Sequence, residues 1–311
     1  MKVCLIDVDS KMPNLALMKI STHHKSLGDE VKLGFDPLID KPDLCYASKI
    51  FDFTPEPEYI PDCPTIKGGP GYSLTAKVEI EGYDRIMPDY SLYPEFDYAV
   101  GRFTRGCPNR CPWCVVWRMD GNEVRHVADL TDFWQGQKMV RILDDNIMAD
   151  EDEFVADCKQ LHDAGVKVSW EALDVRRVND RTAEALATVK QAKSIHFSWD
   201  GKHQERYIEP ALETLRKYGL KGWRFMFYVL VGFNTTREYD MYRIEKLREL
   251  GTYAFVMPYD KTDPYQRHLA RWCNNKAVFK STPRFEDYEP WKRHCEQERK
   301  SNMKDETKVS A

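Results

Sequence analysis

The 311-residue sequence lacks any long hydrophobic run, and this absence excludes the simplest kind of membrane protein. No stretch of about 18 apolar residues occurs, so no transmembrane helix is expected. The stretch Met1–Asp9 is too short and too acidic for a signal peptide, and it predicts a buried strand instead. A large excess of one sign of charge is also missing, because the formal net charge is only −4. There is therefore no global electrostatic case for nucleic-acid binding.

An even, closely paired set of cysteines is missing as well. Nine cysteines, an odd number, are scattered over a long chain. This usage is typical of proteins in a reducing compartment, and we expect a cytoplasmic protein. Hydrophobic residues make up 42% and charged residues 31% of the chain. These fractions predict a soluble globular fold of one large or two modest domains.

Three cysteines nevertheless stand close together, because Cys107, Cys111 and Cys114 have C-x3-C-x2-C spacing. A short loop with this spacing can surround a metal centre, and Pro108 and Pro112 prevent it from forming a regular helix. Three thiolates are one fewer than the four that close most structural zinc and iron–sulfur sites. If the protein supplies no fourth ligand, one metal position stays open for a small molecule.

Other interpretations of this stretch are open. His126 could be the fourth ligand of a zinc site, although the loop lacks a second paired cysteine or histidine motif. Core cysteines packed for hydrophobicity have no reason to share this spacing. The arginines around the loop either balance the charge of a thiolate-rich site, which we favour, or bind an anionic substrate. They are Arg102, Arg105, Arg110, Arg118 and Arg125.

With Trp113 in the aromatic position, the motif C-x3-C-x-(aromatic)-C resembles the cluster loop of the radical S-adenosylmethionine (radical SAM) enzymes. The resemblance implies a [4Fe-4S] cluster whose open iron binds S-adenosylmethionine (SAM). It also implies reductive cleavage of SAM to a 5′-deoxyadenosyl radical, which abstracts hydrogen from a substrate. The substrate is unidentified, with a nucleoside, a nucleotide or a small metabolite compatible, and the electron donor is a protein such as flavodoxin or ferredoxin. A zinc- or cluster-bearing binding module without turnover is the alternative.

Residues 96–265 alternate between apolar runs and amphipathic segments. This alternation predicts an α/β fold with a parallel sheet covered by helices, and six units are too few for an eight-unit barrel. The resemblance implies a partial (β/α)6 barrel with the cluster in the loop after the first strand. The predicted strands begin near Phe96, Lys138, Val166, Ser194, Trp223 and Tyr253.

Residues 1–95 predict a small Rossmann-like α/β domain and linker, with a helix capped by Asn14 between two strands. The glycine-rich turn Lys67–Tyr72 and residues 88–94 resemble the N-terminal half of cobalamin-binding radical SAM proteins. The cobalt-ligand motif D-x-H-x-x-G is missing, because His23 and His24 have no aspartate two residues before them. We therefore expect a degenerate domain that binds no cobalamin. Residues 266–311 predict a C-terminal extension with a disordered tail.

Polar residues at the carboxyl ends of the predicted core strands are the cofactor-binding candidates, because ligands bind at this edge of parallel sheets. Asp144, Asp145 and Asn146 follow the second core strand and can accept hydrogen bonds from an ammonium, and the resemblance assigns this position to the methionine amino group. After the third strand, Arg176 is assigned to the methionine carboxylate. A salt bridge with Asp174 or Glu171 is the other interpretation of this arginine.

The last three core strands supply the remaining candidates. Alternation along the fourth strand places His196, Ser198 and Asp200 on one face, and the resemblance assigns Ser198 and Asp200 to the ribose hydroxyls. Gly232, at the end of the fifth strand, permits close backbone approach, and the resemblance places it beside the adenine. Met257 ends the sixth strand, where the resemblance implies contact with the adenine edge.

Overall fold

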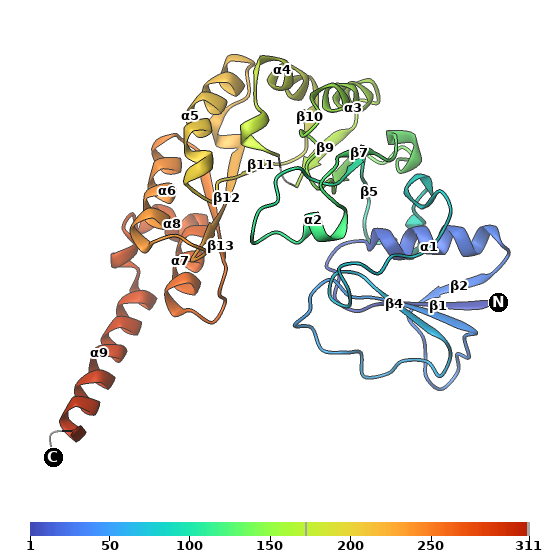
Figure 1. Ribbon diagram of the computed structural model, residues 1–311, viewed down its shortest axis with the longest axis horizontal. Coiled ribbons are helices and arrows are strands. Elements are labelled where there is room, and N and C mark those ends of the chain that lie inside the picture. The colour runs from blue at the N-terminus through green and yellow to red at the C-terminus, as the bar shows by residue number, and fades with distance from the viewer. Residues whose placement is uncertain (172, 310–311) are drawn as a thin grey trace. The chain divides into compact units, whose positions relative to one another are not determined.

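Strands flanked by helices make up most of the structure, a computed structural model that describes residues 1–171 and 173–309, with side chains described as far as Lys300 (Figure 1). The chain divides into two units, Met1–Ile195 and His196–Ala311. The first unit contains two four-stranded sheets and a short hairpin, and the second contains a three-stranded sheet. The predicted boundaries near residues 95 and 265 therefore differ from the division into units.

The first sheet is parallel and has the strand order β2-β1-β3-β4. Its central strand β1 is buried because Val3, Cys4 and Leu5 alternate between two apolar clusters on opposite faces. The glycine-rich turn follows β4 directly, as the sequence pattern suggests. The strands are β1 (Lys2–Asp7), β2 (Glu30–Leu33), β3 (Leu44–Ser48) and β4 (Thr65–Gly68).

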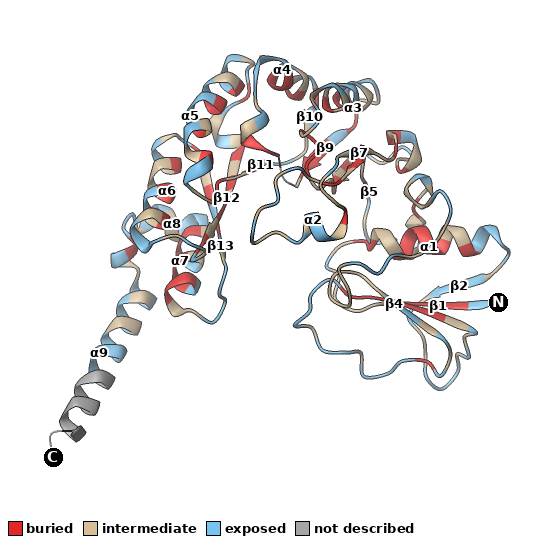
Figure 2. Cartoon of the chain, viewed as in Figure 1, coloured by how far each residue is buried: buried red, intermediate tan, exposed pale blue. Residues whose placement is uncertain are grey.

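Helix α1 (Leu15–Ser26) connects β1 to β2 and begins where the sequence predicts. The Asn14 side chain accepts a hydrogen bond from the Leu17 amide at 3.2 Å, which is the N-cap interaction expected of asparagine. Gly28 follows the helix with φ of +83°, a conformation that glycine adopts without steric cost. The buried face of α1 includes Leu17, Met18 and Ile20, visible as the buried part of this helix in Figure 2.

The second sheet of this unit, here called the core sheet, is also parallel and has the order β10-β9-β8-β5. Helices α3 and α4 pack against each other, and Phe154 of α3 contacts Trp170 of β9. The elements are β5 (Ala99–Gly101), β8 (Met139–Ile142), α3 (Glu151–Asp163), β9 (Lys167–Trp170), α4 (Asp180–Thr188) and β10 (Lys190–Gln191).

The segment between β5 and β8 contains the three clustered cysteines. Two short antiparallel strands, β6 (Thr104–Arg105) and β7 (Arg125–His126), pair at the base of this segment, and no sequence pattern predicted them. A one-turn helix, α2 (Val116–Met119), follows Cys114. The cysteines therefore lie in a loop whose two ends are held together.

The second unit has a sheet of order β11-β12-β13, in which β12 and β13 are parallel. Helix α6 packs on β12 and β13, and α7 packs on β13. The elements are β11 (Ile195–Ser198), α5 (Lys202–Lys217), β12 (Phe225–Val231), α6 (Arg237–Glu249), β13 (Tyr253–Pro258), α7 (Pro264–Asn274), α8 (Lys276–Ser281) and α9 (Glu289–Val309).

The six predicted core strands correspond to β5, β8, β9, β11, β12 and β13. These strands form two separate sheets. Strands β5, β8 and β9 belong to the core sheet, whose edge strand is β10, and β11, β12 and β13 form the sheet of the second unit. A parallel α/β fold is thus confirmed, whereas a partial (β/α)6 barrel formed by the six strands stays a prediction.

The C-terminal residues differ from the prediction in one respect. Helix α9 continues to Val309, through the segment predicted as a disordered tail, and residues 310–311 lie outside the described residues. This segment contains three lysines, one glutamate and one methionine, which are good helix formers. None of the described helices is long and apolar enough to cross a membrane. Short 3₁₀ turns complete the structure at Tyr83–Arg85, Tyr90–Leu92, Leu130–Asp132, Val175–Arg177, Gly222–Arg224 and Phe285–Asp287.

Candidate metal and cofactor site at the cysteine loop

The base of the cysteine loop is closed by backbone contacts. In the β6–β7 hairpin, Thr104 lies opposite His126, and the Cys107 amide donates to the Gly121 carbonyl at 3.2 Å. Gly106 has φ of +91°, and a Cβ atom there would lie 2.1 Å from the Glu123 carbonyl oxygen. Only glycine fits this position, so Gly106 is required for the two ends of the loop to meet.

The three thiols lie in the part of the loop that follows this closure, and all three cysteines are half-buried. The Cys114 amide donates to the Cys111 carbonyl at 3.0 Å, which forms a tight turn between the second and third thiols. Trp113 lies in this turn and is also half-buried.

The spacing of these thiols distinguishes two kinds of metal centre. Among the residues that the structure describes, one group of three potential metal ligands has its ligand atoms within 4.8 Å of one another, and no cysteine belongs to it. A single zinc ion bound tetrahedrally by thiolates would hold the sulfurs about 3.8 Å apart. The three thiols are therefore not gathered as closely as in a preformed zinc site. His126, the predicted fourth zinc ligand, belongs to that other group.

Asp144 and Asp145 bind the chain where it enters the cysteine loop. The Asp144 carboxylate accepts hydrogen bonds from the amides of Phe103 and Thr104 and, at 2.7 Å, from the Thr104 hydroxyl. Asp145 accepts from the Gly106 amide at 2.8 Å and pairs with Arg102 at 3.3 Å. Both predicted cofactor residues thus bind the chain itself, at the carboxyl end of β8.

Burial raises the pKa of both carboxyls, to about 6 in Asp144, against the opposing effect of these hydrogen bonds. The two acids therefore lie in a largely desolvated environment, where a nearby positive charge has a strong effect.

Asn146 is the predicted residue that lies beside a cluster cysteine. Its Nδ2 atom is 3.6 Å from the Cys107 sulfur and donates to Asp174 at 3.0 Å. The Asn146 side-chain oxygen is buried and has no hydrogen-bond partner. A buried acceptor without a donor is costly, so this atom marks a place where a ligand donor fits.

Asp174 is the centre of a polar cluster that includes Asn146, although the sequence suggested it only as a salt-bridge partner. Asn109, between the first two cysteines, donates to Asp174 at 2.9 Å. Arg176 binds it with two parallel hydrogen bonds of 2.7 and 2.8 Å. Burial opposes ionisation of Asp174, but the Arg176, Asn109 and Asn146 hydrogen bonds outweigh it and lower the pKa.

Arg176 is thus placed beside the cysteine loop, with its guanidinium engaged by Asp174. Burial lowers the pKa of Arg176, but Asp174 and then the thiols of Cys111 and Cys107 raise it above its ordinary value. The structure therefore brings Arg176 near two cysteines and also contains the salt bridge that was the other interpretation. Asn109 and Asp174 were missed because nothing in their spacing indicates this contact.

Two of the arginines around the loop are paired with acids of the same chain. Arg105 contacts Asp84 at 2.7 Å and Asp120 at 3.1 Å, and Arg102 contacts Asp145 and Asp120. Asp120 is 5% exposed, so these pairs are largely removed from water. For these two residues the contacts agree with charge balance rather than with a free anion-binding surface.

The candidates of the second unit lie on one face of its sheet. Ile195, Phe197 and Trp199 are buried, whereas His196, Ser198 and Asp200 alternate with them on the less covered face, as predicted. Gln204 joins the last two positions, because it donates to the Ser198 hydroxyl at 3.3 Å and accepts from the Asp200 amide at 2.6 Å. Burial raises the pKa of the Asp200 carboxyl.

Gly232 and Met257 end the two neighbouring strands of this sheet. A Cβ atom on Gly232 would lie 2.2 Å from the Gln266 side-chain nitrogen, so a side chain of α7 packs directly against this glycine, and its place beside the adenine stays a prediction. Met257 is 45% exposed and lies on the same side of β13 as Phe255, which is 37% exposed. The second unit therefore has an accessible sheet face with polar and apolar candidates.

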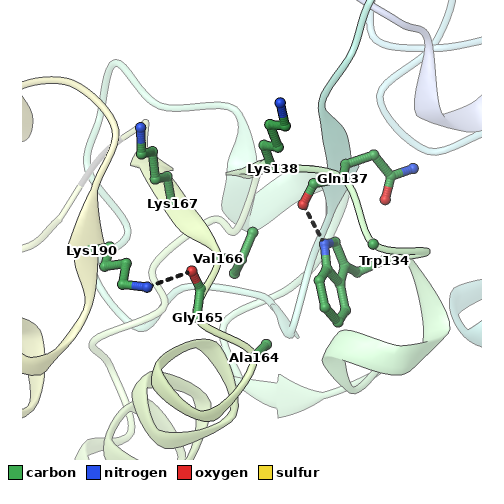
Figure 3. A pocket seen from close by; sticks show the side chains of 9 residues that line it. Trp134, Gln137, Lys138, Ala164, Gly165, Val166, Lys167 and Lys190 are labelled. Carbon is green, nitrogen blue, oxygen red and sulfur yellow. Dashed lines mark hydrogen bonds between the residues drawn. The ribbon is translucent and has the colours of Figure 1, made fainter.

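A hollow of about 340 Å³ lies at the opposite, amino-terminal edge of the core sheet (Figure 3). Trp134 and three lysines line it, and the indole nitrogen donates to the Gln137 carbonyl at 2.8 Å. Lys138 directly precedes β8 and Lys167 is the first residue of β9, whereas the cysteine loop and Asn146 follow the ends of strands. The hollow therefore does not contribute to the cysteine site.

The fold is similar to that of radical SAM enzymes that use cobalamin. One similar structure is a radical SAM methyltransferase, TsrM from Kitasatospora setae, with cobalamin and a [4Fe-4S] cluster bound. The TM-score is 0.62 at 11% identity, covering 83% of this chain and 72% of that one. The second is the cobalamin-dependent SAM radical enzyme OxsB, with aqua-cobalamin and SAM bound. Here the TM-score is 0.56 at 13% identity, covering 89% of this chain and 56% of that one.

These similarities confirm, at the level of the fold, the resemblance that the cysteine loop predicts. The chain spans little more than half the length of OxsB. No protein-family model matches the chain, and no curated protein matches it in sequence.

Proposed function

We propose that this protein is a radical SAM enzyme with a partial (β/α)6 barrel, in which Cys107, Cys111 and Cys114 hold a [4Fe-4S] cluster. When bound, the cluster would supply the electron that cleaves SAM to a 5′-deoxyadenosyl radical, which abstracts hydrogen from an unidentified substrate. The C-x3-C-x2-C spacing, with three thiols and no fourth paired cysteine, supports a cluster with one open iron.

The observation that carries the proposal is Asn146. Its amide nitrogen faces the Cys107 sulfur, and its buried oxygen has no hydrogen-bond partner. The methionine ammonium of SAM is a donor of the required kind, and the open iron would bring it to this side of the loop. We therefore assign Asn146 to the ammonium, with Asp144 and Asp145 as residues that position the loop.

The other predicted residues have roles of the same kind. Arg176, fixed by Asp174 beside the thiols, supplies positive charge for the methionine carboxylate. Ser198 and Asp200 are proposed to bind the ribose. Trp113, Gly232 and Met257 are proposed to border the cofactor, the last two near the adenine.

Cobalamin is not part of the proposal, although both similar structures contain it. His24 is bound on both ring nitrogens, at 2.7 Å to Asp29 and at 3.1 Å to the Tyr46 hydroxyl. Asp29 directly precedes β2, so His24 lies at the amino-terminal edge of that sheet, whereas ligands bind at the carboxyl edge. Equilibration with hydroxocobalamin followed by gel filtration is expected to leave no absorbance of bound cobalamin.

The proposal also includes a protein electron donor such as flavodoxin or ferredoxin and a reducing, cytoplasmic location. The substrate is proposed to be a nucleoside, a nucleotide or a small metabolite. The reaction that follows hydrogen abstraction is left open.

Anaerobic reconstitution with iron and sulfide tests the function. We expect a brown protein with about four irons per chain, and formation of 5′-deoxyadenosine from SAM with dithionite. Replacing Cys107, Cys111 and Cys114 together by alanine should remove the brown colour, the bound sulfide and the product. Cys295→Ala, which removes a thiol outside the loop, is the control and should change none of them. A zinc ion that the triple-alanine variant loses, with no product, would instead establish the binding module.

A further inference from the structure

Asp157 of helix α3 has an unusual environment for a carboxylate. It is 0% exposed, and neither carboxylate oxygen has a hydrogen-bond partner. Burial, and then the nearby acids Asp144, Glu153 and Asp129, raise the pKa of Asp157 to about 9. Such a group is costly unless a cation or a donor compensates for it.

Two further ligand atoms lie next to this carboxylate. His126, Glu153 and Asp157 each place one potential metal ligand within 4.8 Å of the other two. The Nδ1 atom of His126 is 3.1 Å from a Glu153 oxygen, yet it is buried and has no aligned hydrogen bond. An imidazole nitrogen and two carboxylates therefore converge on one point. A metal bound tetrahedrally by such atoms would hold them about 3.4 Å apart, so small side-chain rotations complete the site.

The other ring nitrogen of His126 has the partner that metal-binding histidines usually have. Nε2 lies 3.3 Å from Asp129, whose same oxygen accepts from Gln160 at 3.1 Å. A carboxylate at this position fixes the tautomer with the proton on Nε2, so that Nδ1 presents its lone pair. Two of the ligands, Glu153 and Asp157, are four residues apart and so share one face of α3.

We propose that His126, Glu153 and Asp157 bind one divalent transition-metal ion of the zinc class, with water completing its coordination. The imidazole favours such an ion over Mg²⁺ or Ca²⁺, which prefer oxygen ligands alone. This site contains none of the three clustered cysteines and does not depend on the proposed SAM chemistry.

The position of the site indicates a structural role. His126 belongs to β7, the strand that closes the base of the cysteine loop, and the two acids belong to α3. The ion would therefore join the returning end of the loop to a helix of the core sheet. Thr104, opposite His126 in the hairpin, donates to Asp144. Asp144 would therefore fix one strand of the hairpin, and the metal ion bound by His126 would fix the other.

Zinc binding to the full-length chain tests this inference. The variant with Cys107, Cys111 and Cys114 replaced by alanine is used throughout, so that the cysteine loop binds no metal. After incubation with zinc and removal of excess, we expect about one zinc per chain, and chelation should lower the thermal unfolding midpoint. Asp157→Asn and His126→Gln should each weaken zinc binding by more than roughly 10-fold.

Asp163→Asn is the matched control, because Asp163 is an exposed acid of the same helix that pairs with Lys159. It should retain the zinc. The inference is overturned if Asp157→Asn binds zinc as well as this control, or if the parent chain binds no zinc, Mn²⁺ or Fe²⁺. If Asp157→Asn does not fold, His126→Gln decides. A crystal grown with zinc should give an anomalous peak between the three side chains, and an ordered water there alone would also contradict the proposal.

Discussion

The first unit contains two parallel four-stranded sheets whose carboxyl edges differ in how their polar groups are satisfied. At the N-terminal sheet, Asp7 accepts from Tyr93 at 2.6 Å, and Asn14 donates to the hydroxyls of Ser10 and Ser48. Its glycine-rich turn packs against the chain itself, because a Cβ on Gly71 would lie 2.8 Å from the Phe51 carbonyl. These polar groups are satisfied within the chain.

At the carboxyl edge of the core sheet, the polar groups instead converge on the cysteine loop and leave one acceptor unsatisfied. Asp144 and Asp145 hold the loop, Asp174 organises Asn109, Asn146 and Arg176, and the Asn146 oxygen has no partner. The same type of sheet thus has a self-satisfied edge in one case and a candidate binding site in the other. The difference lies in the residues that follow the strands.

The largest effect is expected from Asp174→Ala, which would test whether the core-sheet edge is organised around this residue. Removal of this carboxylate leaves the partly buried Arg176 guanidinium beside the thiols without its acidic partner. We therefore expect a loss of about 3 kcal/mol in the free energy of unfolding. SAM cleavage per bound cluster should fall roughly 10- to 100-fold. Urea denaturation and 5′-deoxyadenosine formation measure the two effects.

Asp174→Asn is the matched control, since it keeps one acceptor but removes the charge. It should lie between wild type and Asp174→Ala in both measurements. Equal cleavage rates in all three proteins would contradict a role for Asp174 at the site.

The next prediction compares two asparagines at equivalent edges. Asn146→Ala should lower SAM cleavage roughly 10- to 100-fold, and loss of its hydrogen bond to Asp174 should cost about 1 kcal/mol of stability. Asn14→Ala removes an N-cap and should cost about 1–2 kcal/mol of stability without changing cleavage. The same loss of cleavage in both variants would show that the two edges do not differ as proposed.

The last prediction concerns pH. The folded-state pKa of Asp144 is about 6 against an ordinary value of 3.8, chiefly because of burial. The folded protein therefore retains this proton where the unfolded chain has lost it. The contribution of this proton to the free energy of unfolding is fully present below the ordinary pKa of 3.8. It is lost as the pH rises to about 6, by up to about 3 kcal/mol.

Asp144→Asn removes this titration, so the stability of wild type relative to the variant should decrease between about pH 4 and about pH 6. Urea denaturation of both proteins across this range measures the difference. A difference that stays constant with pH would mean that Asp144 is not desolvated in the folded protein.

Much of the fold could be predicted from local sequence patterns. The six core strands follow apolar runs, and α1 begins at Asn14, because strand burial and helix capping are determined by neighbouring residues. The alternation of His196, Ser198 and Asp200 was also predictable, since side chains in a strand point to opposite faces in turn. The β6–β7 hairpin was missed because each of its strands has only two residues.

The site was less predictable, because its contacts join residues far apart in the sequence. The cysteine spacing indicated where a metal centre lies, but not that Asp174 would bind Asn109, Asn146 and Arg176 together. The same holds for His126, whose partners Glu153 and Asp157 lie on a helix that follows the next strand. Only tertiary structure brings these groups together, and no local pattern records it.

The close fit of Gly106 against the Glu123 carbonyl means that any side chain at position 106 would force apart the two ends of the cysteine segment. The segment is also fixed from outside, because Asp144 and Asp145 bind Thr104 and Gly106. A redesign that moves the segment into another scaffold would therefore have to keep this glycine and supply both acids as well.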